Sequence, residues 1–188
     1  FSTSANIELN GYMIKPSNFD AQKEYPVIMT QYSGPNSQEV TDSWDIDWHY
    51  YLAEQGYIVA CVDPRGTAAR GEDFRKCTYQ QLGKLESDDM VEAAHYLASL
   101  PYTNASKIGI WGWSYGGFMA ALCMNKGADI FKAGIAVAPV TNWRYYDTVY
   151  TERYMRTPQQ NPFGYDENSP INNVENIKGN LLVIHGTA

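Results

Sequence analysis

Hydrophobic and polar positions follow two different periods along this chain. Short apolar runs at residues 25–32, 57–62, 107–111, 134–138 and 181–184 are typical of buried strands. Between several of these runs, apolar residues recur at three- and four-residue spacing, as they do on one face of a helix. Alternation of strands and helices with short connections predicts an α/β fold, with a mostly parallel sheet covered by helices on both faces.

Three further elements can be placed from local signals. Residues 7–13 alternate apolar and polar positions as an edge strand does, and residues 48–53 predict a helix that closes at Gly56. Ser87 is predicted to cap a second helix, and Pro101 to stop it. The apolar face of this second helix comprises Met90, Val91, Ala94, Leu97 and Ala98.

The junction after the predicted strand 107–111 carries Gly-x-Ser-x-Gly at residues 112–116. This spacing suits a serine that is forced onto a sharp strand-to-helix turn. Gly112 and Gly116 have no Cβ, so strand and helix can approach closely while Ser114 takes a strained backbone geometry. Its hydroxyl then lies near the positive end of the helix, where an oxyanion is stabilised. Gly-rich turns match the same pattern by chance, but the flanking strand and helix favour a nucleophile.

A nucleophile on such a turn is followed along the chain by an acid and then by a histidine. The acid is expected after the second strand beyond the serine, which here is 181–184. The sequence stops at Ala188, so we expect both residues beyond it. We therefore expect residues 1–188 to be a partial domain cut from a longer protein, with the C-terminal part of the domain missing.

Composition narrows the function. The 188 residues are 44% hydrophobic, enough for one domain with a sizeable core, and the net charge of −7 argues against a nucleic-acid partner. Three cysteines and three scattered histidines lack metal-ligand spacing, so neither a metal nor another cofactor is expected. Cys61 and Cys123 are predicted to be buried. His185 ends a strand near the predicted site but precedes the expected acid, so it does not fit the role of base.

Several short segments together carry a family resemblance that spans nearly the whole chain. They are YSGP at 32–35, DPRG at 63–66, GWSYGG at 112–117, APV at 138–140, Trp143, YYD at 145–147, YTERYM at 150–155 and HGTA at 185–188. The chain resembles the catalytic domain of the dipeptidyl peptidase IV branch of the prolyl oligopeptidase family. Pro64 departs from the family, which usually has glycine there. The resemblance implies an α/β-hydrolase fold and a serine exopeptidase that removes X-Pro or X-Ala dipeptides from peptide amino termini.

Two hydrogen-bond donors are needed at the oxygen of the tetrahedral intermediate in such a reaction. One is the backbone N–H of Tyr115, the residue after the nucleophile. The second usually comes from a loop after an earlier strand, where Tyr32 stands; from position alone, Tyr32 could equally be a ring packed at a strand end. The resemblance implies that the Tyr32 hydroxyl is the second donor.

The long polar-aromatic stretch 139–179 is a candidate for substrate binding, since segments of this length are usually functional. Together with Tyr115, four of its residues would make an apolar, flat-walled cavity suited to a proline ring: Val140, Trp143, Tyr146 and Tyr150. The last three also fall at the spacing of one helix face, and spacing alone favours plain packing. The resemblance favours the pocket, above all for Tyr146 and Tyr150.

The resemblance has further implications for the parent protein. It implies an N-terminal propeller domain whose acidic pair holds the free amino terminus of the substrate, a homodimer, and a periplasmic or cell-surface location. Two alternatives remain open: an acylaminoacyl peptidase or esterase on the same fold, and a catalytically dead interaction domain.

Overall fold

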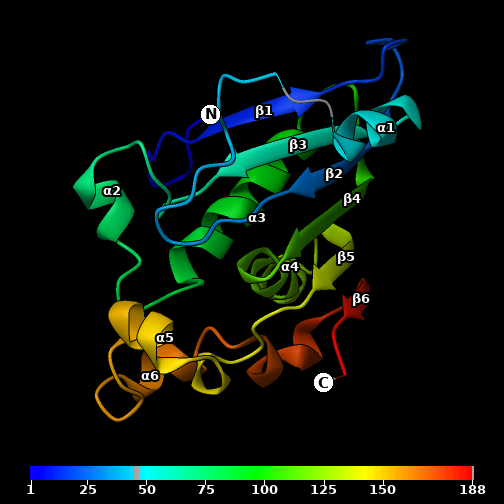
Figure 1. Ribbon diagram of the computed structural model, residues 1–188. Helices are drawn as coiled ribbons and strands as arrows, with labels where there is room; N and C mark the ends of the chain where they lie inside the picture. Colours follow the sequence, from blue (N-terminus) through cyan, green and yellow to red (C-terminus); the bar gives the residue numbers. More distant parts are fainter. Residues whose placement is uncertain (45–46, 188) are drawn as a thin grey trace.

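The computed structural model describes residues 1–44 and 47–187; Ala188, the last residue of the HGTA segment, lies outside them. Its centre is a six-stranded sheet in the order β1-β3-β2-β4-β5-β6 (Figure 1). β1 pairs antiparallel with β3 at one edge, and all other neighbours are parallel. The strands are β1 (Asn10–Ile14), β2 (Tyr25–Thr30), β3 (Ile58–Asp63), β4 (Thr103–Trp113), β5 (Phe131–Val137) and β6 (Asn180–Ile184).

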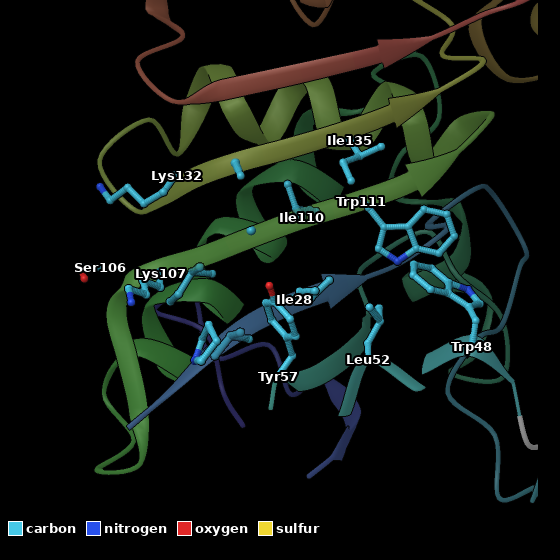
Figure 2. Close-up of a pocket in the computed structure, with 15 residues that line it drawn as sticks. Ile28, Trp48, Leu52, Tyr57, Ser106, Lys107, Ile110, Trp111, Lys132 and Ile135 are labelled. Carbon is cyan, nitrogen blue, oxygen red and sulfur yellow. The ribbon is translucent and has the colours of Figure 1, made fainter. Parts of the chain in front are cut away.

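Helices cover both faces of this sheet, as predicted. Gly134 faces α4, since a Cβ there would lie 2.6 Å from Met124 Cγ. Its neighbour Ile135 faces the other way and lines a hollow of about 530 Å³ with Trp48 and Leu52 of α1 (Figure 2). The helices are α1 (Trp48–Glu54), α2 (Glu72–Lys76), α3 (Lys84–Ala98), α4 (Tyr115–Lys126), α5 (Thr148–Met155) and α6 (Pro162–Asp166), with 3-10 turns η1 (Trp143–Tyr145), η2 (Pro170–Asn172) and η3 (Val174–Asn176).

The core lies between the sheet and the α3–α4 pair. Eleven of the twelve residues of α4 are buried, and only Lys126 at its end is exposed. A helix that is apolar on all sides must be enclosed, and α4 is packed against β4, β5 and α3. This enclosure fixes the start of α4, and therefore the turn that precedes it. Within the described ranges, no helix has the length and apolar character needed to cross a membrane.

The predicted start of α3 at Ser87 is wrong. The helix begins at Lys84, after Gly83, whose φ of +88° is left-handed. The Glu86 carboxylate accepts a hydrogen bond from the Gly83 backbone N–H (3.0 Å), and this contact caps the helix. Ser87 lies inside the first turn and donates to the carbonyl oxygens of Gly83 and Lys84 (2.5 and 3.0 Å). A buried carboxylate thus takes the capping role that the sequence suggested for a hydroxyl.

The predictions for α1, for the edge strand and for the two buried cysteines agree with the structure more closely. The helix at 48–53 is confirmed as α1, and Gly56 follows its end with φ +92°. The predicted edge strand exists but is shorter than expected, since β1 starts only at Asn10. Cys61 and Cys123 are buried, at 1% and 0% exposure, as small apolar residues of the core.

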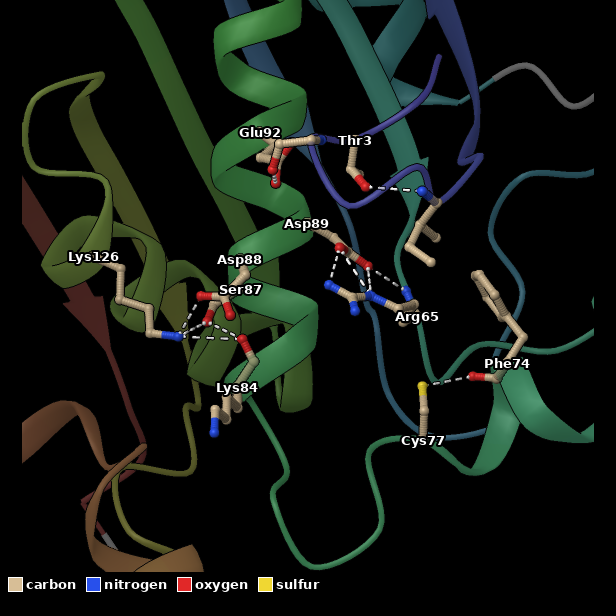
Figure 3. A network of polar contacts seen from close by, with 12 residues as sticks. Thr3, Arg65, Phe74, Cys77, Lys84, Ser87, Asp88, Asp89, Glu92 and Lys126 are labelled. Atoms are coloured by element: carbon tan, nitrogen blue, oxygen red, sulfur yellow. Dashed lines mark hydrogen bonds and ion pairs between the residues drawn. The ribbon is translucent and has the colours of Figure 1, made fainter.

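Polar contacts fasten α3 to two neighbouring elements (Figure 3). Asp89 is fully buried and receives hydrogen bonds from the Arg65 guanidinium (2.6–3.1 Å) and from the Arg65 backbone N–H (2.8 Å). The loop after β3 is thereby held against α3. At the other side, Lys126 Nζ at the end of α4 donates to Asp88 and Ser87, both at 2.8 Å. The two helices that enclose the core are therefore linked at the surface as well.

Candidate active site

Ser114 stands alone between the last residue of β4 and the first residue of α4. Its backbone has φ +58° and ψ −114°, a conformation that costs an L residue free energy. The Ser114 N–H donates to the carbonyl oxygen of Val137 in β5 (2.8 Å), and its own carbonyl accepts from Phe118 N–H in α4 (3.0 Å). The strained turn is thus held from both sides by the sheet and the helix.

The glycines around Ser114 are required by close approach, as the sequence predicted. A Cβ on Gly116 would lie 2.5 Å from the carbonyl oxygen of Gln31, the residue that follows β2. A Cβ on Gly112 would lie 2.5 Å from the backbone of Gly116, and one on Gly117 would lie 2.7 Å from the carbonyl oxygen of Val137. Any larger side chain would push the helix away from the sheet, and the turn would open.

Tyr32 lies in the loop that follows β2, half-buried beside the turn. Its ring covers Gly34, where a Cβ would lie 2.5 Å from Tyr32 Cε1. Its centroid is 6.1 Å from that of Tyr115. Burial, together with nearby Tyr146, raises the pKa of the Tyr32 hydroxyl, so the group remains a protonated donor at neutral pH.

Tyr115 contributes its backbone and its ring in different places. The N–H belongs to the first turn of α4, where backbone donors have no partner within the helix. The ring is only 2% exposed and packs against Phe118 and Trp143, so it does not line an open cavity. Its hydroxyl donates to Glu86 Oε1 at 2.7 Å. Burial raises the pKa of the Glu86 carboxyl to about 7.

A hollow of about 440 Å³ opens beside Ser114. Val140 and Tyr146 line it, as does His185 from the segment after β6. Trp143, by contrast, is 2% exposed and is therefore buried. It contacts the rings of Tyr146 and Tyr150, both with centroids 5.8 Å away. The structure thus brings three predicted aromatic residues into one cluster, of which Tyr146 reaches the hollow beside Ser114.

Trp143, Tyr146 and Tyr150 do not share one helix face, which was the alternative that their spacing suggested. Trp143 belongs to η1, Tyr146 follows it in an extended conformation, and Tyr150 belongs to α5. Two separate N-caps cause the break. Asn142 accepts from the Arg144 N–H, and Asp147 accepts from the Tyr150 N–H, both at 2.8 Å. The cluster is therefore assembled by two short elements within the long segment 139–179.

His185 borders the hollow, as its place after β6 suggested. Its Nδ1 lies 3.2 Å from the carbonyl oxygen of Gly186. His49 and His95 lie on α1 and α3, in agreement with their predicted helices. Among residues 1–44 and 47–187, no three His, Cys, Asp or Glu side chains are grouped so that they could hold a metal ion.

Two buried polar side chains at this site, Glu86 and Gln31, were not predicted from the sequence. Glu86 meets Tyr115 across 29 residues of chain, and Gln31 meets Gly116 across 85. Neither residue stands in a local pattern that signals a contact. The one available signal was a polar residue in an otherwise apolar context, which is Gln31 at the end of the run 25–32.

A serine on a tight turn between a strand and a buried helix, in a mostly parallel sheet with helices on both faces, defines an α/β-hydrolase fold. The profile of the prolyl oligopeptidase family matches residues 44–188. The chain belongs to the prolyl oligopeptidase family.

Relatives agree with this assignment. The chain is 48% identical to a "Probable dipeptidyl-aminopeptidase B" of Paracoccidioides lutzii, over 97% of this chain and 21% of the relative. It superposes on the crystal structure of Porphyromonas gingivalis dipeptidyl peptidase 4 with a TM-score of 0.97 and 55% identity, covering 100% of this chain and 27% of that one. A putative dipeptidyl aminopeptidase IV from Bacteroides ovatus gives a TM-score of 0.94 and 42% identity, covering 98% and 27%. The chain spans about a fifth of the length of the fungal relative.

Proposed function

We propose that the full-length protein containing this chain is a serine-type dipeptidyl peptidase that removes X-Pro and X-Ala dipeptides from peptide amino termini. The observation that carries the proposal is the backbone of Ser114, held at φ +58° between β4 and α4 by glycines that tolerate no Cβ. Strain of this kind persists where the surrounding structure enforces it, and it is concentrated at functional sites. The names of the relatives supply the class of reaction.

Ser114 is the proposed nucleophile. Its Oγ attacks the carbonyl carbon of the second residue of the peptide, and a base takes the hydroxyl proton. The resulting oxyanion accepts hydrogen bonds from the Tyr115 N–H and the Tyr32 hydroxyl. The C–N bond then breaks, and the base returns the proton to the leaving amine. Water hydrolyses the acyl-enzyme by the same route and releases the dipeptide.

The acid and the base of this triad are proposed to follow Ala188 in the full-length protein. Their order along such chains is serine, acid, histidine, and β6 is the second strand after the turn. His185 lies before the position where the acid is expected. Its Nδ1 is engaged with Gly186, and we assign it no proton transfer.

The proposed substrate pocket is the aromatic cluster beside Ser114. Val140 and Tyr146 line the hollow, and the rings of Trp143 and Tyr150 pack edge-on against the ring of Tyr146. Aromatic faces suit the compact ring of proline, which has no N–H that needs an acceptor. An alanine side chain fits the same space with fewer contacts. Selectivity for proline or alanine at the second position follows from this shape.

Two properties of the parent protein complete the proposal. A propeller domain outside residues 1–188 would hold the free amino terminus of the substrate with an acidic pair, and thereby limit cleavage to dipeptides. The full-length protein would act as a homodimer. Sedimentation velocity tests the second point, since a monomer at working concentration would contradict it.

A substrate panel on the full-length protein tests the reaction class. Chromogenic X-Pro, acyl-amino acid and simple ester substrates are compared by kcat/KM. We expect the X-Pro substrate to lead, and blocking its amino terminus to abolish turnover. Preference for the acylated substrate would indicate an acylaminoacyl peptidase, and preference for the ester would indicate an esterase. Failure to turn over any of them, together with failure to react with a fluorophosphonate, would indicate an interaction domain.

A further inference from the structure

The loop that carries Tyr32 and the turn that carries Ser114 are joined by the side chain of Gln31. Its Nε2 donates to the carbonyl oxygen of Gly116 at 2.8 Å, and its Oε1 accepts from the Ser33 hydroxyl at 2.9 Å. We propose that Gln31 is a positioning residue that fixes the Tyr32 hydroxyl relative to the Tyr115 N–H, the two donors to the oxyanion. This inference rests on the proposed function.

Gln31 contacts the serine turn at both of its glycines. The Gln31 carbonyl oxygen lies 2.5 Å from the place of a Cβ on Gly116, and Nε2 lies 2.7 Å from the place of a Cβ on Gly112. Backbone and side chain of one residue therefore fill the space that the missing Cβ atoms leave. Because two segments 85 residues apart meet here without a gap, a shift of one segment is transmitted to the other.

A carboxamide is suited to this place because it offers a donor and an acceptor on the same rigid plane. The donor engages the start of α4, and the acceptor engages the Tyr32 loop. Gln31 is 5% exposed, so water does not compete for these bonds. An apolar side chain of the same size would fill the space but would fix neither segment in register.

The hydrogen bond that Gln31 Oε1 accepts also explains the strained backbone of Ser33. Ser33 has φ +66°, a left-handed conformation that is uncommon for a residue other than glycine. Its hydroxyl is held by Gln31, and this bond favours the conformation that directs the chain after Tyr32. Release of Ser33 would let the loop relax and carry the Tyr32 hydroxyl away from its working position. Displacement of a catalytic group by about 1 Å can cost on the order of 100-fold in rate.

The test is Gln31→Met in the full-length protein, which keeps the length of the side chain and removes all of its hydrogen bonds, including a longer one to the Trp111 carbonyl oxygen (3.5 Å). We expect kcat for an X-Pro substrate to fall by about 10–100-fold while KM changes by less than about threefold, since the loss falls on the transition state. The matched control is Gln81→Met. The Gln81 amide also donates to a backbone carbonyl, that of Cys77 (2.9 Å), but outside the site, so its kcat should stay within about twofold of wild type.

A double-mutant cycle distinguishes an effect of Gln31 on the position of Tyr32 from a general loss of stability. If Gln31 acts through Tyr32, the substitution Gln31→Met should cost less than about threefold in kcat when Tyr32→Phe is already present. The same 10–100-fold loss in both backgrounds would overturn the proposal, as would an unchanged kcat in Gln31→Met. A lower melting temperature with full kcat would show a structural role only and would likewise overturn it.

Two further variants keep the proposal falsifiable if Gln31→Met does not fold. Ser33→Ala removes only the acceptor-side bond, whereas Gln31→Glu keeps the acceptor for Ser33 and replaces the donor to Gly116 by an acceptor. Each should lower kcat in the presence of Tyr32 and have little effect in its absence; two variants with wild-type kcat would contradict the proposal. An inactive wild type that also resists a fluorophosphonate would overturn the proposed function itself. A wild type that is active, slowed by Tyr32→Phe and indifferent to Gln31 would overturn this inference alone.

Discussion

The hydroxyl of Tyr115 donates a 2.7 Å hydrogen bond to Glu86, and both side chains are buried. The second carboxylate oxygen of Glu86 accepts from the Gly83 N–H, so one acidic group joins the start of α3 to the residue after Ser114. Both of these hydrogen bonds lower the pKa of Glu86, whereas the negative charge of Asp89 raises it. Burial dominates and raises the pKa of Glu86 from 4.5 to about 7.

This raised pKa predicts a particular pH dependence of stability. The folded state holds the Glu86 proton more tightly than the unfolded chain, so the carboxyl lowers stability as pH rises from about 4.5 to about 7. Glu86→Gln removes this effect. Its stability relative to wild type should therefore increase over that range, by on the order of 3 kcal/mol in the limit. Thermal unfolding of both proteins at a series of pH values checks it.

Tyr115→Phe gives the control for that measurement. The hydrogen bond from Tyr115 lowers the Glu86 pKa, so its removal should shift the loss of stability to higher pH. Parallel stability curves for wild type, Glu86→Gln and Tyr115→Phe would contradict the prediction, because they would mean that the pKa of Glu86 is the same in the folded and the unfolded protein.

Replacing a glycine by alanine should affect kcat at the serine turn but not at a glycine elsewhere in the fold. Gly116→Ala should lower stability by about 1–3 kcal/mol or more and reduce kcat at least tenfold, because its Cβ would meet the Gln31 carbonyl oxygen at 2.5 Å. Gly71→Ala is the control: its φ is +91°, but no atom lies within 4 Å of the added Cβ. It should cost about 1–2 kcal/mol through backbone strain and leave kcat unchanged. Equal effects on kcat would argue against the turn as the reactive centre.

Two ion pairs made by residues of α3 should differ strongly in how much they contribute to the free energy of unfolding. Asp89→Asn leaves Arg65 without its partner in a pair whose acid is fully buried, and we expect a loss of about 3–5 kcal/mol. Asp88→Asn breaks the pair with Lys126, in which both side chains are about one third to one half exposed, and should cost less than about 1 kcal/mol. Chemical denaturation measures both. Similar losses would mean that Arg65 finds another acceptor.

The sequence predicted those parts of the fold that depend on neighbouring residues. The turn at Ser114 followed from glycine spacing, and the end of α1 followed from Gly56, because each glycine acts on its own backbone. The start of α3 could not be predicted in this way. Ser87 is an ordinary capping residue, but the side chain that caps the helix is Glu86, whose second oxygen is fixed by Tyr115.

The sequence suggested members for the candidate site but not how the chain brings them together. The family resemblance named Tyr146 and Tyr150, but their spacing suggested a single helix. Asn142 and Asp147 each start a new element, and local capping of this kind overrides periodicity. Contacts such as that of Gln31 with Gly116 depend on how distant strands are ordered in the sheet, and no local sequence pattern predicts them.

The pocket proposal predicts a difference between Tyr146 and Tyr150. Tyr146 is 45% exposed at the hollow, whereas Tyr150 stacks on Trp143 and contacts Tyr154, with centroids 4.9 Å apart in the latter pair. Tyr146→Ala should lower kcat/KM for X-Pro by about 10–100-fold with little effect on melting temperature, and Tyr150→Ala should lower both. Tyr51→Ala, at an exposed position of α1, is the control.

The informative quantity for this pocket is the ratio of kcat/KM for X-Pro over X-Leu. Tyr146→Ala and Tyr150→Ala should both lower this ratio, since a larger cavity tolerates bulkier side chains. A lower melting temperature with an unchanged ratio would mean that these tyrosines only support the fold.

The central claim is that Ser114 is the nucleophile, and covalent labelling tests it most directly. The full-length protein is treated with a fluorophosphonate, and the modified peptide is identified by mass spectrometry. We predict one label, on Ser114, that appears in step with loss of X-Pro hydrolysis, and no label on Ser114→Ala, whose kcat should fall by on the order of 10⁶. Hydrolysis by Ser114→Ala at a rate near wild type, or a label on another serine, would contradict the account.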